Sequence, residues 1–296
     1  MKQTMNPCPI CSAQMEPFLN CIDYTVSGEQ FAIEKCGSCG FLRTASPPAP
    51  SQIGRYYKAE SYISHSDTRK GLISKLYHAV RVVMLNRKRA MVSALAGRKS
   101  GSLLDIGCGT GSFLHHMQQH GWEVTGLEPD ADARKVAQNK HQLELSDPEQ
   151  LFTLPHNHFN VITLWHVLEH VHPLHEYMAQ ISKILAPEGL LVLALPNPES
   201  YDAKRWGNEW AAWDVPRHLW HFSPESVNRL AQQHGFRVVA QKPMPFDAFY
   251  VSMLSSRYAK RPFPLLDGVA CGLAGWIRSW HKSSASSSLI YFIRRA

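Results

Sequence analysis

The sequence has 296 residues, of which 44% are hydrophobic and 19% are charged, an ordinary globular composition. That length suits one sizeable domain with a small additional module. No run of about eighteen apolar residues occurs and the N-terminus lacks an apolar leader, which excludes a transmembrane helix and a secretory signal, so we expect a cytoplasmic protein.

The formal charge of +7 is concentrated in two segments. Residues 69–99 contain nine Lys/Arg and no Asp/Glu, and residues 250–296 contain seven Lys/Arg and one acid, so these segments carry +15 and the remainder −8. Either they form solvated helix faces, or they face an anionic partner such as a phosphorylated substrate, a membrane surface or RNA.

Residues 1–45 contain two C-x-x-C pairs, formed by Cys8, Cys11, Cys36 and Cys39. In a cytoplasmic chain this pattern favours metal over disulfides. Each pair presents two thiolates from one tight turn, and two such turns complete a tetrahedral zinc site. Because four thiolates leave no open position, we predict a structural zinc in a ribbon-like module, with Cys21 as a bystander.

A proline-rich boundary at 46–51 follows, and residues 46–100 are predicted as a linker with basic cap helices. From residue 101 to 296, strands alternate with helices. Strands are expected at 103–106, 122–127, 160–164, 190–195, 236–240 and 288–293, and helices at 113–119, 131–140, 174–185 and 224–234. This alternation predicts a doubly wound α/β fold with a mostly parallel sheet and helices on both faces.

The boundary between the first of these strands and its helix carries the string D-I-G-C-G-T-G at 105–111. Glycines permit unusual backbone angles and close approach of a ligand, and a helix start can receive a carboxylate. Glu128 follows the next strand, where an acid can bind both hydroxyls of a ribose. Since Ser112 stands where the G-x-G-x-x-G fingerprint needs its third glycine, the spacing argues against NAD.

This string resembles motif I of class I S-adenosylmethionine methyltransferases. Residues 159–171 and 187–193 resemble the family's fourth-strand motif and its turn into the fifth strand. The most similar subgroup is the ubiquinone-methyltransferase-like set often labelled methyltransferase 23. The resemblance implies a Rossmann-like, seven-stranded sheet with an antiparallel edge strand, and methyl transfer by direct displacement. The expected cofactor-binding residues are Asp105, Gly107, Cys108, Gly109, Thr110, Gly111, Glu128, Asp147, Trp165 and His166.

Residues 166–170 also fit H-x-x-E-H, the pattern of some zinc peptidases, but they follow a strand of a methyltransferase frame. Some ubiquinone-type relatives hold a divalent metal with Glu-x-x-Glu-His at this place, where this chain has His166 instead of the first Glu. We therefore favour local hydrogen bonding of Glu169 and His170 over metal binding.

Residues 206–222 combine four tryptophans with one arginine and two histidines. We expect this segment to wall the acceptor site, with Trp206, Trp210, Trp213 and Arg217 contacting substrate. His218 or His221 suits a general base, because histidine titrates near neutral pH. The alternative is that one of these histidines caps the helix beginning near Ser223.

Three readings of the function are open. The first is methyl transfer to a small-molecule, sugar or lipid-precursor acceptor. The second is an RNA methyltransferase that uses the zinc module and the basic flanks, although no Asn/Asp-Pro-Pro-Tyr motif follows the fourth strand. The third is a non-catalytic binding protein. Residues 244–286 are expected to form a lid or a membrane-touching helix pair, because aromatic and basic residues cluster there.

Overall fold

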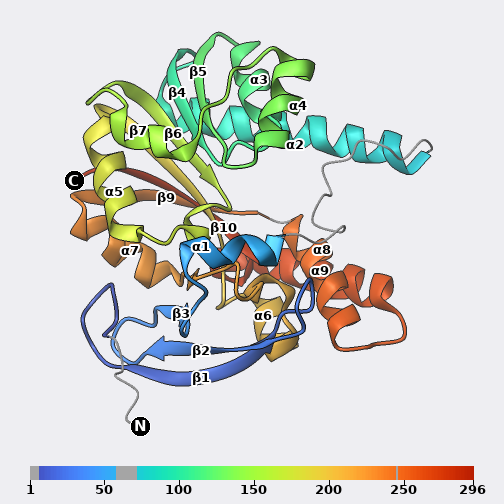
Figure 1. The fold of residues 1–296 in the computed structure, drawn as a ribbon. Helices are drawn as coiled ribbons and strands as arrows, with labels where there is room; N and C mark the ends of the chain where they lie inside the picture. The colour runs from blue at the N-terminus through green and yellow to red at the C-terminus, as the bar shows by residue number, and fades with distance from the viewer. Residues whose placement is uncertain (1–6, 58–71, 245) are drawn as a thin grey trace. The chain divides into compact units, whose positions relative to one another are not determined.

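The computed structural model describes residues 7–57, 72–244 and 246–296 (Figure 1). Its strands are β1 Met15–Ile22, β2 Gln30–Cys36, β3 Leu42–Thr44, β4 Gly101–Ile106, β5 Trp122–Leu127, β6 Phe159–Trp165, β7 Leu185–Pro196, β8 Trp220–His221, β9 Phe236–Pro243 and β10 Ser288–Arg295. Its α-helices are α1 Pro50–Ile53, α2 Leu72–Ala96, α3 Ser112–Gln118, α4 Ala131–His141, α5 Leu174–Ile184, α6 Tyr201–Trp206, α7 Pro224–Gln233, α8 Asp247–Tyr258 and α9 Pro264–His281. Short 3-10 helices are η1 Gly54–Tyr57, η2 Pro148–Thr153, η3 Leu168–His170, η4 Gly207–Glu209, η5 Ala211–Trp213 and η6 Ser283–Ala285.

The chain divides into two compact units. The sheet unit consists of Ile63–Val167, His175–Leu193 and Phe292–Ala296, and the ribbon unit of Met1–Tyr62, Leu168–Leu174 and Ala194–Tyr291. The boundaries predicted at residues 45 and 100 remain predictions. Part of the predicted linker and cap helices, residues 58–71, lies outside the described residues, as does residue 245 of the predicted lid.

In the sheet unit, β4 pairs in parallel with both β5 and β6. Leu103 and Leu104 of β4 and Val161 and Ile162 of β6 are fully buried. Strands buried on both faces are typical of a parallel sheet that helices cover from both sides. The α/β fold that the sequence predicted is therefore confirmed.

The larger sheet has the strand order β5-β4-β6-β7-β10-β9, one strand fewer than the seven expected. Between β5 and β6, where the family resemblance implies a further strand, the described chain forms only a single parallel bridge between Leu127 and Ser146. The chain leaves the sheet there because Asp147 caps η2, whose first residue is Pro148. The last strand, β10, lies between β7 and β9, so β9 forms the edge.

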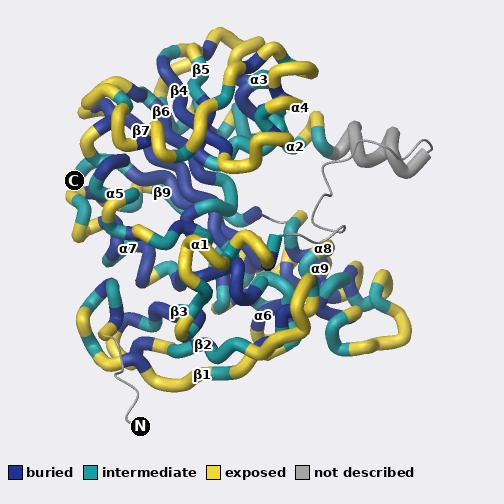
Figure 2. Tube along the Cα trace, viewed as in Figure 1, coloured by how far each residue is buried: buried dark blue, intermediate teal, exposed yellow. Residues whose placement is uncertain are grey.

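The ribbon unit contains an antiparallel sheet with the order β1-β2-β3-β8. Three of these strands come from the cysteine-rich module, whereas β8 lies about 180 residues later in the chain. Buried residues of the cysteine-rich module and of the segment from residue 203 onward share one hydrophobic core. Figure 2 colours the buried positions along the chain. This core contains Cys21, Ile33, Leu42, Ala203, Trp206, Trp210, Trp213, Val215 and Cys271. The module is thus packed into the same body as residues 203–215.

Among the helices that the structure describes, none combines the length and the apolar composition that crossing a membrane requires.

Candidate functional site

The turn between β4 and α3 depends on glycine. Gly107 and Gly109 have φ values of 70° and 56°, in the left-handed region that glycine adopts most easily. A Cβ at Gly107 would lie 2.4 Å from Cγ2 of Val167, whereas apart from the adjacent residues no described atom lies within 4 Å of one built at Gly109. The turn is therefore crowded at its first glycine and open at its second, where a ligand can approach the main chain.

Glu128 lies against this turn. One carboxylate oxygen accepts a hydrogen bond from the Gly109 N–H at 2.7 Å, and the other accepts one from the Asp130 N–H at 3.0 Å. The side chain stands at the end of β5 and the residue is 8% exposed. The structure thus brings together the acid and the glycine that the sequence placed nineteen residues apart. An open main chain beside a buried carboxylate fits a ligand that carries a ribose.

The other residues of the glycine string support the turn from within the protein. Asp105 is buried and accepts a hydrogen bond from the Thr163 hydroxyl at 2.5 Å, which joins β4 to β6. Burial raises the pKa of Asp105 to about 7, although the positive charge of Lys88 acts to lower it. Burial also raises the pKa of the Cys108 thiol. Thr110 places its hydroxyl 3.4 Å from that of Ser112.

Trp165 and His166 lie where β6 ends. The Trp165 ring stands edge-on to Phe113, and Lys88 Nζ lies 4.0 Å from the Trp165 ring centroid. The indole N–H of Trp165 is buried and has no hydrogen-bond partner within the described chain, which suits a donor reserved for a ligand. His166 adopts a left-handed φ of 58°, uncommon for a non-glycine residue.

Asp147, the residue expected at the adenine, serves as a helix cap in the structure. Its carboxylate accepts a hydrogen bond from the Glu149 N–H at 3.1 Å and lies 3.4 Å from Arg134 Nη1. The side chain is 52% exposed, so contact with a ligand stays a prediction.

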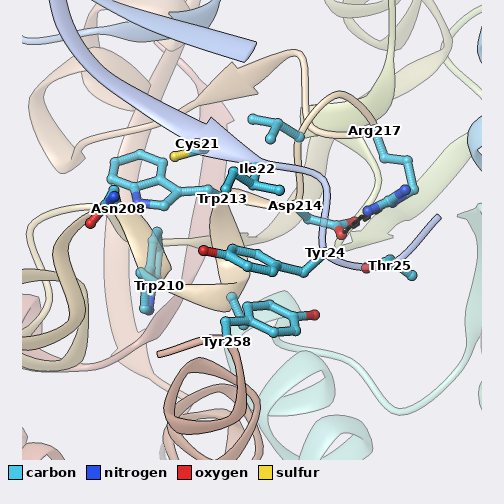
Figure 3. A pocket seen from close by; sticks show the side chains of 12 residues that line it. Cys21, Ile22, Tyr24, Thr25, Asn208, Trp210, Trp213, Asp214, Arg217 and Tyr258 are labelled. Atoms are coloured by element: carbon cyan, nitrogen blue, oxygen red, sulfur yellow. Dashed lines mark hydrogen bonds and ion pairs between the residues drawn. The ribbon is translucent and has the colours of Figure 1, made fainter. Parts of the chain in front are cut away.

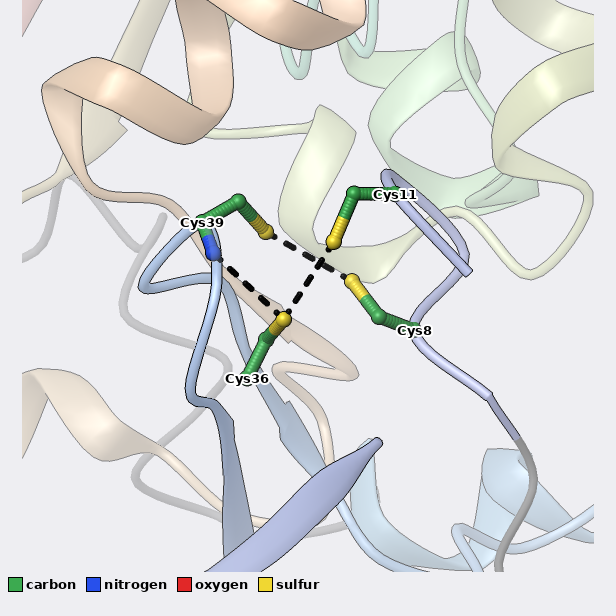
Figure 4. Close-up of side chains that lie close together, drawn as sticks. All are labelled: Cys8, Cys11, Cys36 and Cys39. Atoms are coloured by element: carbon green, nitrogen blue, oxygen red, sulfur yellow. Dashed lines mark hydrogen bonds between the residues drawn. The ribbon is translucent and has the colours of Figure 1, made fainter. Parts of the chain in front are cut away.

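The four paired cysteines converge on one point. Figure 4 shows their sulfur atoms pointing toward one another. The Cys8–Cys39 and Cys11–Cys36 Sγ distances are 3.6 and 3.3 Å, and all four sulfurs lie within 4.8 Å of one another. Zn–S bonds of about 2.3 Å in a tetrahedron place the sulfurs roughly 3.8 Å apart. The arrangement is compatible with a zinc site, and all four thiols are free of disulfides.

The aromatic segment at 206–222 is held by hydrogen bonds within the protein. The Trp210 indole N–H donates to Asp202 at 2.8 Å, and that of Trp213 donates to the Gly207 carbonyl at 2.7 Å. Both rings, but not Trp206, border a hollow of about 10 Å³ that also contacts Tyr24 and Tyr258 (Figure 3). This volume is below the roughly 300 Å³ at which ligand pockets usually begin.

Arg217 has its guanidinium bound inside the ribbon unit. It is 1% exposed, and its Nη2 lies 2.9 Å from Asp23 and 2.7 Å from Asp214, while Nη1 donates to the Tyr56 carbonyl at 2.9 Å. Burial opposes ionisation of Asp23, but Arg217 and the Ser27 N–H outweigh it and hold the Asp23 pKa below its usual value. In the structure Arg217 thus links Asp23 and the Tyr56 carbonyl to Asp214 through ion pairs and a hydrogen bond. Contact of Arg217 with substrate stays a prediction.

The two candidate bases differ in their surroundings. His218 Nδ1 contacts the Ala212 carbonyl at 2.9 Å, and because a carbonyl only accepts, this nitrogen carries a proton, while Nε2 lies 3.9 Å from an Asp214 carboxylate oxygen. His221 Nε2 lies 3.2 Å from the Thr44 hydroxyl, whose own proton goes to the His218 carbonyl. Burial lowers the pKa of His221 well below its usual value, so His221 is neutral. The cap of α7 is Ser223 itself, not a histidine.

Glu169, His170 and His218 each place a ligand atom within 4.8 Å of the others. His170 Nδ1 contacts the Arg217 carbonyl and the Tyr57 hydroxyl, each at 3.0 Å. Burial and the neighbouring His218 lower the pKa of His170 to about 4. Neutral imidazoles with a carboxylate are a donor set that divalent metals accept, and His218, not His166, completes it. The hydrogen-bond partners of His170 lie 47 and 113 residues away in the chain, and the choice between metal binding and hydrogen bonding at this site stays a prediction.

Several of these partners were not foreseen from the sequence. Asp23 is 194 residues from Arg217, and Thr44 is 177 residues from His221. Tyr57 likewise meets His170 across 113 residues. None of the three belongs to a motif or a periodic pattern, so only the fold reveals them.

A family model described as a methyltransferase domain matches residues 79–241. A ubiquinone biosynthesis O-methyltransferase of Rhodopseudomonas palustris is 24% identical over 221 residues, which cover 69% of this chain and 86% of the relative. One of the same description from Psychrobacter cryohalolentis is 34% identical over 136 residues, covering 39% of this chain and 52% of the relative. The matches thus span from about half to nearly nine-tenths of the relatives' length.

Among solved structures, the Burkholderia thailandensis 1,6-didemethyltoxoflavin-N1-methyltransferase, with 1,6-didemethyltoxoflavin and S-adenosylhomocysteine bound, superimposes with a TM-score of 0.50. The alignment covers 95% of this chain and 99% of that one at 15% identity. At that identity the likeness shows the fold alone.

Proposed function

The chain belongs to the methyltransferase domain family, and we propose that it transfers the methyl group of S-adenosylmethionine to a small-molecule acceptor. The family match confirms the predicted class of enzyme. The observation that carries the proposal is the glycine turn, with open space above Gly109 and the Glu128 carboxylate hydrogen-bonded beside it. A small-molecule acceptor is supported by relatives that are described as acting in ubiquinone biosynthesis.

Bound S-adenosylmethionine supplies a methyl group activated by a positively charged sulfur. The glycine turn would hold the methionine part of the cofactor, and Glu128 would accept hydrogen bonds from the ribose hydroxyls. Asp105 positions the turn, because its buried bond to Thr163 fixes β4 beside β6. The protein's main contribution is then to orient the two reactants and to exclude water.

His218 is the better of the two candidate bases. Its Nδ1–H is held by the Ala212 carbonyl, which fixes the ring, so that in the neutral imidazole Nε2 would take a proton from an acceptor. His221 is a positioning residue, because its Nε2–H is given to Thr44 of β3. The cysteine cluster would hold a zinc ion that stabilises the module carrying Thr44 and Asp23, and four thiolate ligands would leave no open position for chemistry.

Calorimetry on the zinc-loaded protein tests the cofactor site. Wild-type protein should bind S-adenosylmethionine and S-adenosylhomocysteine but not NAD. Glu128→Ala should weaken binding about 10- to 100-fold, the effect of losing hydrogen bonds to a charged group. Glu123→Ala, at an exposed position of β5, the strand that precedes Glu128, is the matched control and should bind like wild type. Equal affinity of the two variants, or binding of NAD alone, would overturn the assignment.

Turnover to S-adenosylhomocysteine tests the base and the acceptor class together. A panel should contain phenolic quinone precursors, sugar nucleotides and ribosomal RNA. With the best acceptor, His218→Gln should lower kcat by about 10²-fold or more, as expected for loss of a general base. His221→Gln should retain most of kcat. Turnover with RNA alone would replace the small-molecule proposal by the RNA alternative.

A further inference from the structure

Helix α9 buries its small residues and exposes its large apolar ones. The buried positions follow one helix face and are Gly268, Cys271, Gly272, Gly275 and Ser279. The exposed positions on the other face include Leu265, Leu266, Val269, Leu273, Trp276, Ile277 and Trp280. Leu265 and Trp280 are each 68% exposed. A helix of a water-soluble domain normally shows the opposite arrangement.

The small inner face is explained by helix α8. A Cβ added at Gly268 would lie 2.8 Å from the Met253 Cβ, and one added at Gly272 would lie 2.7 Å from the Phe249 ring. The two helices therefore approach so closely that only glycine fits at these positions. Close packing of the hairpin accounts for the small residues of α9, but it leaves its large apolar residues on the outside.

The exposed apolar residues are concentrated in this hairpin. Of the 18 large apolar side chains exposed in the described part of the chain, nine lie between residues 250 and 280. Besides the seven on α9, these are Tyr250 of α8 and Phe263 of the connection. Figure 2 shows the exposed positions along the α8–α9 connection. Single exposed apolar residues are normal, whereas such a gathering marks an interaction surface.

Basic residues border this apolar surface. Arg257, Lys260 and Arg261 lie at one end of the hairpin, and Arg278 and Lys282 lie at the other, all of them exposed. The acid of the hairpin's second helix, Asp267 in the first turn of α9, accepts a hydrogen bond from the Ser256 hydroxyl at 2.7 Å and lies 3.6 Å from Arg261. Residues 257–282 thus contain five Lys/Arg and one acid, a net charge of +4.

We propose that the α8–α9 hairpin is a membrane-docking surface, which lays the apolar face of α9 into the interface of an anionic lipid bilayer. An 18-residue helix is about 27 Å long and lies along the surface, with its large apolar side chains among the upper acyl chains. The ring pair of Trp276 and Trp280, 5.3 Å apart, suits the headgroup level, and the basic ends suit anionic headgroups.

Charge favours lipid over a second copy of the chain on this surface. A symmetric pair would bring two faces of +4 together, whereas an anionic bilayer complements them.

Flotation of the full-length, zinc-loaded protein with vesicles tests the proposal. Protein should float with phosphatidylcholine vesicles that contain phosphatidylglycerol, and less with phosphatidylcholine alone, and added salt should weaken binding. The double variant Leu266→Glu/Trp280→Glu should bind at least tenfold more weakly. Lys260→Glu and Lys282→Glu should each weaken binding about fivefold or more, the contribution expected of one basic residue near the surface.

The matched control is Val136→Glu/Phe152→Glu, which places the same charges at exposed apolar positions of the sheet unit and should float like wild type. Thermal unfolding of each variant shows whether the fold is retained. Tryptophan emission should shift to the blue on vesicles in wild type and not in the α9 double variant. Absence of flotation with anionic vesicles, equal loss in both double variants, or a dimer that Leu266→Glu/Trp280→Glu dissociates would overturn the proposal.

Discussion

The glycine turn of the sheet unit and the Arg217 cluster of the ribbon unit were both expected to bind ligands, and they differ in how their contacts arise. In the turn, Gly109 and Glu128 follow neighbouring parallel strands, and the structure joins them by a hydrogen bond. In the cluster, Arg217 is engaged by Asp23, 194 residues away. The difference shows that a motif whose residues meet through adjacent parallel strands is readable from the sequence, whereas a cation among aromatic rings can equally serve as an internal clamp.

Removing zinc should produce the largest loss of stability. It should affect the Arg217 cluster and leave the glycine turn unchanged, which would distinguish the two regions. Asp23 and Thr44 belong to the module that the cysteine cluster closes, so a chelator should loosen the partners of Arg217 and His221. Structural zinc supplies on the order of 10 kcal/mol to small zinc-binding folds. In hydrogen–deuterium exchange, peptides from 15–44 and 206–222 should lose protection first, while peptides from 101–128 keep theirs.

Cysteine variants provide the control for this prediction. Cys36→Ser should lower the zinc content from one ion per chain, whereas Cys21→Ala, which removes a thiol buried outside the cluster, should leave it at one. Equal protection of 15–44 with and without zinc would contradict the assigned role of the metal.

Breaking the Arg217 clamp should have the next largest effect. Arg217→Ala leaves the Asp23 carboxylate buried without its guanidinium, and removing one partner of a buried pair costs about 3–5 kcal/mol of unfolding free energy. Chemical denaturation measures this loss. Arg229→Ala, which breaks an exposed pair with Glu225, should leave the unfolding free energy nearly unchanged. A small loss in Arg217→Ala with a large loss of acceptor affinity would restore its predicted role in substrate binding.

A smaller effect is expected from Asp105, whose ionisation should make the free energy of unfolding depend on pH. Folded Asp105 keeps its proton up to about pH 7, whereas the unfolded side chain releases it near pH 4, so unfolding releases a proton in this window. Stability should therefore fall as pH rises, by roughly 3 kcal/mol between pH 5 and pH 8 from this group. Asp105→Asn should remove that part of the dependence, as measured by denaturation at several pH values.

The sequence by itself determined the features that depend on neighbouring residues. The alternation of strands and helices, the glycine turn with its acid, and the two cysteine pairs follow from local geometry, because each element is shaped by its own few residues. The six sheet strands lie close to the predicted ranges. The further strand implied between β5 and β6 is shortened because the cap at Asp147 ends it, a local signal that the sequence also contained.

The tertiary structure alone decided what the polar residues of the ribbon unit contact. Whether Arg217, His218 and His221 face a ligand or the protein depends on Asp23, Ala212 and Thr44, which no sequence pattern connects to them. The same holds for α9, whose composition does not reveal which face α8 covers. Burial is a property of the packed chain, so the partner of a buried charge and the exposure of an apolar face appear only once distant segments have met.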